Sequence, residues 1–239
     1  MRTANKKATK TKRFAIAERA ASFWFDIGTR VASALFFALA AGIYFHNAFA
    51  HLRNSAMAPS HLAWAADVAS MFAIAFFMFI VAYIYAVRLR AISKFAGIVP
   101  MMAAIGGAFL NCGLLFLHPR TDLPVTAKIA TALLILVGNS FAIWGLRYLG
   151  RSFSILPEGQ KLVTGGPYRF VRHPLYVGEF FATLGAMINF LSPAAVALVV
   201  TQILLQFARI HYEEKVLRTT LPGYAVYAKR TSRLIPGIY

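Results

Sequence analysis

The sequence GPYRFVRHPLYVGEF, from Gly166 to Phe180, connects a polar loop to an apolar helix. Gly166 and Pro167 predict a sharp turn, because glycine allows a positive φ and proline fixes φ near −65°. Pro174 fits the first position of a helix, where its missing N–H costs nothing. We therefore expect a turn that lets the backbone approach a ligand closely, followed by a helix that begins at Pro174.

Two basic residues lie at the start of this predicted helix. Arg172 and His173 would stand beside its free N–H groups, and that arrangement favours an anion such as a carboxylate or a phosphate. Other interpretations remain open at this point. Arg172 alone could anchor the helix to lipid headgroups, and His173 alone could simply cap it.

The composition predicts that this helix belongs to a membrane protein. The 239 residues are 59% apolar and 14% charged, with a mean hydropathy of +0.62, whereas soluble domains are roughly one-quarter charged. Apolar runs close to the ~20 residues that cross a hydrocarbon core lie at about 31–50, 65–87, 98–117, 125–149, 175–191 and 193–207. The fifth run is short, so with the turn at Ser192 and Pro193 it predicts a helical hairpin that barely spans. The predicted fold is all-α: a polytopic membrane bundle of about six transmembrane helices with a C-terminal helical hairpin.

The net charge of +17 is explained by membrane orientation. If the N-terminus is cytoplasmic, 22 of the 25 Lys and Arg residues fall on the cytoplasmic side, and Arg53, Arg120 and Lys128 fall outside. This is the positive-inside pattern, which requires no nucleic acid as a partner. Residues 1–20 are expected to form a basic, disordered cytoplasmic tail that can contact anionic lipids.

Cysteine and histidine give no sign of a metal site. The single cysteine, Cys112, lies within the third apolar run and is expected to fill the core. The six histidines show no spacing typical of metal ligands. We expect no bound metal.

The chain divides by its polar content. Residues 21–149 are expected to form a region of four membrane helices whose few polar residues bond between helices. Residues 150–239 are more polar and contain the long connection Gly150–Pro174, which is expected to be functional.

The last predicted helix carries a polar stripe. At 100° per residue, Gln202, Gln206, Arg209 and Glu213 fall within about 60° of one another. Glutamines within an apolar helix require a partner or a water-filled cavity. Arg209 and Glu213 could form a simple surface pair, but the favoured order places the acid before the base, so we expect a shared cavity instead. The same projection turns His211 away and leaves Glu214 on the flank.

The segments LVTGGPYRFVRHPLYVGEF (Leu162–Phe180) and RIHYEEKVLRTTLPGYAVYAKRTSRLIPGIY (Arg209–Tyr239) resemble the isoprenylcysteine carboxyl methyltransferase family, which is related to phospholipid methyltransferases. The resemblance covers about the last ninety residues and extends back to LRYLGRSFS at Leu146–Ser154. It implies a helical membrane enzyme that binds S-adenosylmethionine in a cytoplasmic pocket, built from the loop, the hairpin and the C-terminal tail.

The resemblance also implies roles for individual residues. Arg209 would orient the accepting group, and Glu213 would hold the polar groups of the cofactor; both are our candidate catalytic residues. The expected acceptor site comprises Gln202, Gln206 and Arg209. The expected cofactor site comprises Leu162, Val163, Gly166, Pro167, Tyr168, Arg172, His173, Tyr176, Glu213 and Glu214. Tyr224, Tyr227 and the tail Arg233–Tyr239 are expected either to fold back as a lid or to anchor at the membrane interface.

The resemblance leaves the acceptor open. The expected substrate is a lipophilic small molecule or a lipid-modified one, and Arg209 favours a carboxylate because an amine acceptor would gain nothing from it. A phospholipid amine or a thiol is the alternative on the same scaffold, and an NADPH-dependent reductase or a transporter is the alternative from another class. The expected location is the bacterial inner membrane, with both termini and the active site cytoplasmic.

Overall fold

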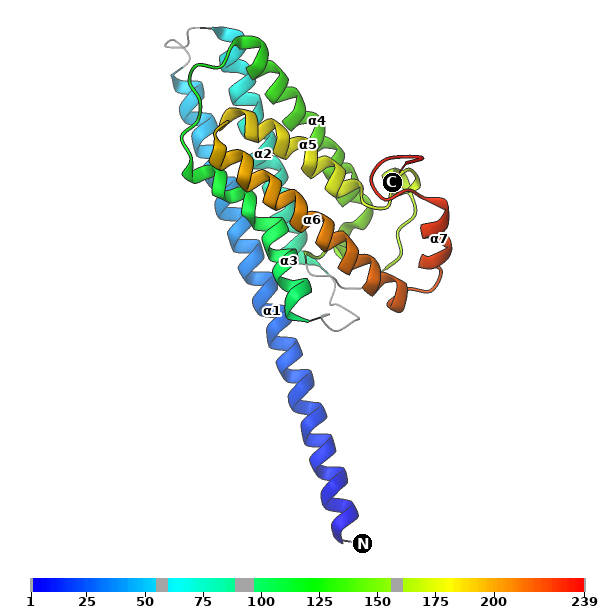
Figure 1. The fold of residues 1–239 in the computed structure, drawn as a ribbon. Coiled ribbons are helices and arrows are strands. Elements are labelled where there is room, and N and C mark those ends of the chain that lie inside the picture. Colours follow the sequence, from blue (N-terminus) through cyan, green and yellow to red (C-terminus); the bar gives the residue numbers. More distant parts are fainter. Residues whose placement is uncertain (1, 55–59, 89–96, 156–160, 239) are drawn as a thin grey trace.

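The computed structural model describes residues 2–54, 60–88, 97–155 and 161–238, and for residues 2–23 and 25 only the backbone. Its elements in chain order are α1 (Arg2–Arg53), α2 (His61–Val87), α3 (Ile98–Phe109), η2 (Leu110–Phe116), α4 (Val125–Leu149), η3 (Gly150–Ser152), η4 (Gly166–Arg169), α5 (Pro174–Asn189), α6 (Pro193–Thr220) and α7 (Tyr224–Arg230). Figure 1 shows the long helices packed side by side as one bundle. The predicted all-α fold is confirmed.

Within the described residues, five helical segments are long and apolar enough to cross a membrane. They are Asp26–Arg53, His61–Val87, Ile98–Phe116, Val125–Ser152 and Pro193–Thr220. Many large apolar side chains on them are exposed, including Leu39, Tyr83 and Leu204 at 61–70%, as expected of surfaces that face lipid. The predicted fifth helix is α5, which has only 16 residues and forms the expected hairpin with α6. Ser192 caps α6 by accepting a hydrogen bond from Ala195 N, and Pro193 occupies its first turn.

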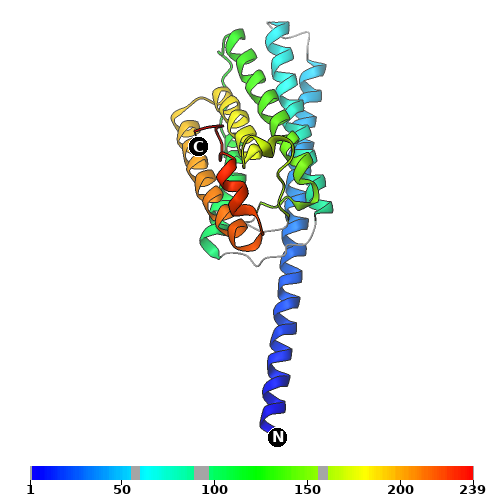
Figure 2. The same ribbon diagram turned by 90° about the vertical axis from the view of Figure 1, so that its right-hand side faces the viewer.

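The N-terminal segment differs from the expected disordered tail. Helix α1 begins at Arg2 and continues to Arg53, so residues 2–20 are helical. The segment 2–25 contains no glycine or proline and is rich in Ala, Lys and Arg, which are strong helix formers. This first part of α1 extends beyond the bundle at the end where α6 finishes and α7 lies (Figures 1 and 2).

Close packing of α4 against α5 fixes the base of the C-terminal hairpin. Gly138 and Gly178 face each other so closely that a Cβ on either would overlap backbone atoms of the opposite helix. Small residues allow such an approach between membrane helices, where van der Waals contact rather than hydrophobic burial holds them together. Helix α4, which the sequence assigned to the N-terminal region, is thus a direct support for α5.

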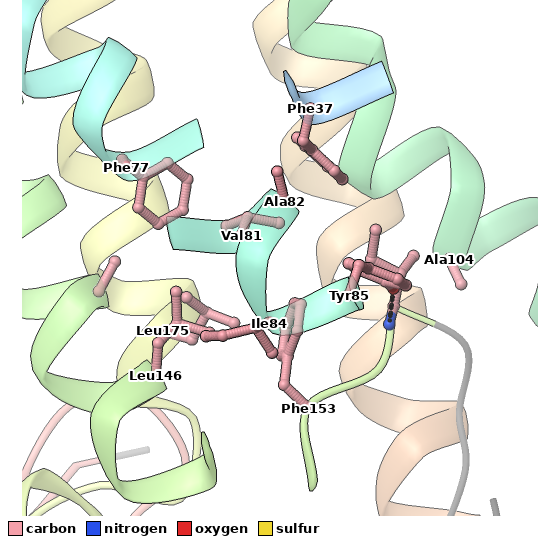
Figure 3. Close-up of a cluster of buried hydrophobic side chains, with 12 residues drawn as sticks. Phe37, Phe77, Val81, Ala82, Ile84, Tyr85, Ala104, Leu146, Phe153 and Leu175 are labelled. Atoms are coloured by element: carbon pink, nitrogen blue, oxygen red, sulfur yellow. Dashed lines mark hydrogen bonds between the residues drawn. The ribbon is translucent and has the colours of Figure 1, made fainter. Parts of the chain in front are cut away.

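The main apolar cluster lies between α1, α2 and α4 and reaches the loop after η3. Its central residues include Phe37, Val81, Tyr85, Leu146 and Phe153, each at most 6% exposed. Figure 3 shows Tyr85 beside Phe153, with the Tyr85 hydroxyl accepting a hydrogen bond at 2.7 Å from the backbone N–H of Ile155. The cluster therefore holds the loop after α4 against the bundle, where that loop can form a wall of a pocket.

Candidate active site

An open pocket lies beside the last turns of α6, where the C-terminal part of the chain folds back. It encloses about 730 Å³ including its mouth. Its lining is contributed by the loop after α4, the start of α5, the end of α6 and α7, and it comprises Leu149, Ser152, Phe153, Ser154, Lys161, Leu162, Val163, Tyr168, Arg172, His173, Leu175, Tyr176, Glu213, Leu217, Leu221, Tyr224 and Tyr227. It thus combines apolar walls with a few charged and phenolic groups, as small-molecule sites commonly do.

The turn at Gly166 and Pro167 forms as predicted and shapes one side of the pocket. Gly166 has φ +59°, and a Cβ at this position would overlap the ring of Tyr148. Pro167 is fully buried in η4. Neither residue is among the pocket lining, so their role in this structure is to place Tyr168, which does line it.

The C-terminal tail docks on the loop before α5. The backbone N–H of Arg172 donates to Ser232 O at 2.8 Å, and that of His173 donates to Arg233 O at 3.1 Å. The Tyr227 hydroxyl donates to Tyr168 O at 2.7 Å. The tail therefore folds back over the site, the first of the two arrangements expected for it.

Glu214 is the centre of the charged network beneath this tail. Its side chain is 3% exposed; Oε1 accepts from Arg172 Nε at 2.8 Å and lies 3.2 Å from His173 Nε2, and Oε2 lies 3.2 Å from Arg233 Nη2. Arg218 lies on the same helix, and its Nη2 is 3.6 Å from Glu214 Oε2. The carboxylate thus ties α6 to the loop and the tail, although it does not line the pocket.

Arg172 and His173 turn inward, toward this network. Besides Glu214, the Arg172 guanidinium donates to the carbonyl oxygens of Ala228, at 2.6 Å, and of Thr231. Pro174 occupies the first turn of α5 as predicted, and the His173 side chain makes no capping hydrogen bond. Both residues line the pocket, but their described polar contacts brace the tail.

Tyr176 connects the pocket to the polar stripe of α6. Its hydroxyl donates to Glu213 Oε2 at 2.6 Å, and the Arg209 guanidinium lies 4.9 Å from the centre of its ring, a cation–π arrangement. Arg209 is 2% exposed. Both candidate catalytic residues therefore contact Tyr176. Of the stripe, only Glu213 lines this pocket, so the shared cavity expected for the stripe stays a prediction.

The phenols around the pocket are held in their protonated form. Burial raises the pKa of Tyr168 well above its ordinary value and raises that of Tyr227 to about 12. Burial likewise raises the pKa of Tyr224, whose Oη is buried without a hydrogen-bond partner in the part of the chain described. A buried donor without a partner is costly, so Tyr224 is suited to a polar atom of a ligand in this pocket.

The glutamines of the stripe point away from the pocket, toward the neighbouring helices. Gln202 Nε2 donates to Gly107 O of α3 at 3.1 Å. Gln206 Nε2 donates to Glu179 Oε2 of α5 at 2.6 Å. Sequence reasoning did not single out Glu179, although an acidic residue within an apolar helix, three positions after Tyr176, was a signal for it.

Seven of the ten residues expected to bind the cofactor line the pocket: Leu162, Val163, Tyr168, Arg172, His173, Tyr176 and Glu213. The other three, Gly166, Pro167 and Glu214, lie behind it and support its walls. The acceptor candidates Gln202, Gln206 and Arg209 lie beyond Tyr176, outside the lining.

Among the described residues, no cluster of three or more His, Cys, Asp or Glu side chains could hold a metal ion. Residues 156–160 of the long connection lie outside the described residues.

An ion pair supports the pocket wall from the N-terminal side. Arg88, which is 3% exposed, donates to Asp26 Oδ1 of α1 at 2.6 Å and to Ser154 Oγ at 2.8 Å. Ser154 lines the pocket. The first two helices therefore help to position the C-terminal site, although the sequence resemblance does not reach them.

Comparison with known proteins finds similarity to one family over part of the chain. Residues 126–222 match the family model described as phospholipid methyltransferase. The protein-S-isoprenylcysteine O-methyltransferase B of Arabidopsis thaliana is 32% identical over 110 residues, 43% of this chain and 56% of the relative. The resemblance found in the sequence is thus confirmed as a similarity over part of the chain: residues 126–222 match phospholipid methyltransferases, and a stretch of similar length matches an isoprenylcysteine O-methyltransferase.

Two bacterial relatives have names of another kind. The cobalt-zinc-cadmium resistance protein CzcN of Cupriavidus metallidurans is 35% identical over 137 residues, 54% of this chain and 59% of the relative. The nickel-cobalt-cadmium resistance protein NccN of Alcaligenes xylosoxydans xylosoxydans is 40% identical over 81 residues, 33% and 38% of the two chains. The chain spans about half the length of the curated relatives it matches, or less. A solved structure of the eukaryotic intramembrane Ras methyltransferase ICMT aligns over 89% of this chain and 96% of its own, with 16% identity and a TM-score of 0.41.

Proposed function

We propose that this protein is an integral membrane methyltransferase that transfers a methyl group from S-adenosylmethionine to a lipophilic acceptor, with a carboxylate of the isoprenylcysteine type as the favoured acceptor. The observation that carries the proposal is the position of Tyr176. Tyr176 lines the pocket, and its hydroxyl donates a hydrogen bond to Glu213. Its ring faces the buried guanidinium of Arg209. A cofactor site and an anion site would then share one wall.

The pocket residues fit the chemistry of the cofactor. Glu213 offers a carboxylate for its ammonium or ribose hydroxyl groups, and Lys161 offers a cation for its carboxylate. Tyr224 supplies a buried hydroxyl that has no hydrogen-bond partner among the described residues. Apolar walls from Leu149, Val163 and other residues suit the adenine ring. When bound, S-adenosylmethionine supplies a methyl group already activated on a sulfonium.

The protein then has to align the acceptor and exclude water. Arg209 can hold an anionic group by two parallel N–H contacts while leaving one oxygen free to attack. Its Nε is buried without a hydrogen-bond partner among the described residues, so this donor is available to an anionic ligand. A carboxylate acceptor is already deprotonated, so the site needs no general base.

We extend the proposal to the organisation of the chain. The region 150–239 would bind the cofactor and carry out catalysis, and α1 to α4 would support it from the membrane. The pocket and both termini would be cytoplasmic, in a bacterial inner membrane, in accord with the positive-inside pattern. Phospholipid amines and thiols are the alternative acceptors, since the matching family model describes phospholipid methyltransferases.

The direct experiment is to incubate the purified protein with methyl-labelled S-adenosylmethionine and a panel of prenylated thioether acids, phospholipids and alkyl thiols, and then to identify the labelled product. We expect label on an acid as a base-labile methyl ester. Label on an amine or a thiol would refute the carboxylate, and absence of any labelled product would refute the methyltransferase assignment.

A further inference from the structure

A carboxylate lies within the apolar part of α5, one turn beyond the pocket. Tyr176, Glu179 and Thr183 are spaced three and four residues apart and so share one face of the helix. All three bond to other elements on this face: Tyr176 to Glu213, Glu179 to Gln206, and Thr183 to Asn111 Nδ2 at 2.6 Å. We call Tyr176, Glu179, Gln206 and Arg209 the polar seam.

The hydrogen-bond capacity of the seam is only partly used. The bond from Gln206 engages Glu179 Oε2, and Oε1 of the same carboxylate makes no hydrogen bond in the part of the chain that the structure describes. Arg209 Nε and Gln206 Oε1 are buried and likewise lack partners among the described residues. Because the Gln206 nitrogen donates to the Glu179 carboxylate, Glu179 also fixes the direction in which Gln206 Oε1 points. The seam therefore offers a free donor and free acceptors.

This combination selects among acceptors. Arg209 faces the ring of Tyr176, one turn from Glu179, and it lies one turn from Gln206, which bonds Glu179. A head group with only an anion is therefore attracted by Arg209 and repelled by Glu179. A head group that carries an N–H or O–H donor next to its anion satisfies both. Because buried polar groups without partners are penalised strongly, such a site discriminates well against an analogue that lacks the donor.

We propose that Glu179 is a specificity-determining residue that accepts a hydrogen bond from a donor group placed next to the anionic group of the acceptor. The acceptor class is then a lipophilic acid with an adjacent N–H or O–H, rather than a simple lipophilic acid. This inference rests on the proposed function, since it places the anion of the acceptor at Arg209.

The test is a cycle that combines one protein change with one acceptor change. Binding and turnover are measured for wild type and Glu179→Gln with an N-acylated S-prenylcysteine, and with the matching 3-(prenylthio)propanoic acid, which lacks the N–H. The change from a charged to a neutral hydrogen-bond acceptor is expected to weaken binding of the first acid about tenfold and that of the second by less than twofold. Thr183→Val is the matched control: it removes a polar group from the same face one turn deeper, and it should affect both acids equally.

Binding and turnover are recorded separately so that the two proposals can fail separately. Equal weakening of both acids in Glu179→Gln would show that Glu179 only balances the charge of Arg209, and it would overturn the inference. If Glu179→Gln loses cofactor binding and so folds poorly, Glu179→Asp is used instead. Aspartate keeps the charge on a shorter side chain, so this variant should again weaken binding of only the donor-bearing acid. Binding of neither acid to wild type would also overturn the inference, whereas the expected binding pattern without turnover would refute the methyltransferase proposal alone.

Discussion

Glu213 and Glu214 are adjacent in the sequence, but the structure predicts opposite consequences when each is changed to glutamine. Glu214 is 3% exposed and contacts Arg172, His173 and Arg233. Removing one member of a buried charge network costs about 3–5 kcal/mol, and because glutamine keeps one oxygen we expect the lower end, about 3 kcal/mol. For a chain of this size that corresponds to roughly 6–12 °C in the unfolding temperature.

Glu213 is half-buried, and its described hydrogen bond is the one from Tyr176. Glu213→Gln should therefore change the free energy of unfolding by less than about 1 kcal/mol. It should weaken S-adenosylmethionine binding by about 1.5–3 kcal/mol, ten- to a hundredfold, if the carboxylate holds the cofactor through a charge-assisted bond.

The two variants are compared by thermal unfolding in detergent and by titration with the cofactor. Trypsin cleavage after Lys229 and Arg230 reports separately on the tail, which should be cut faster in Glu214→Gln. The assignment of Glu214 to stability and of Glu213 to cofactor binding is wrong if Glu213→Gln is the less stable variant. It is also wrong if Glu214→Gln leaves stability and tail cleavage unchanged.

Three further predictions concern the acceptor site, the turn and the topology. Arg209→Lys should lower turnover at least tenfold and change cofactor affinity by less than about twofold, because a compact ammonium cannot reproduce two parallel contacts; full activity in this variant would contradict anion recognition by Arg209. Gly166→Ala should weaken cofactor binding in the same titration, because alanine at φ +59° is strained and its Cβ would overlap Tyr148, whereas Gly237→Ala at the tail, with open space around it, should not. A cysteine placed at Ser60 should react with an impermeant thiol reagent added outside the cell and one at Ser152 should not; the reverse pattern would put the pocket on the other side of the membrane.

Local chemistry made much of this fold predictable. Gly166, Pro167 and Pro174 act through their own backbones, so the turn and the helix start could be inferred from residue type alone. The membrane helices followed from the length of the apolar runs, and helix periodicity placed Arg209 and Glu213 on one face of α6. The helical N-terminal segment was not predicted, because its dense positive charge indicates a solvated tail while its Ala, Lys and Arg residues favour a helix.

The centre of the charged network could not be predicted in the same way. An angular projection placed Glu214 on the flank of α6, because it treats the helix as isolated. In the structure the partners of Glu214 come from 42 residues earlier, at Arg172, and from 19 residues later, at Arg233. Such contacts depend on how the tail docks, and a one-helix pattern contains no information about that. Glu179 was overlooked although an acidic residue within an apolar helix was a signal for it; only its partner, Gln206 on another helix, could not be inferred from α5 alone.

The central claim is that the pocket beside Tyr176 binds S-adenosylmethionine. It is tested most directly by titrating the purified protein with this cofactor and, separately, with NADPH, while following thermal stability. The account predicts saturable stabilisation by S-adenosylmethionine, weakened ten- to a hundredfold in Glu213→Gln, and none by NADPH. Stabilisation by NADPH instead, or by neither compound, would contradict it.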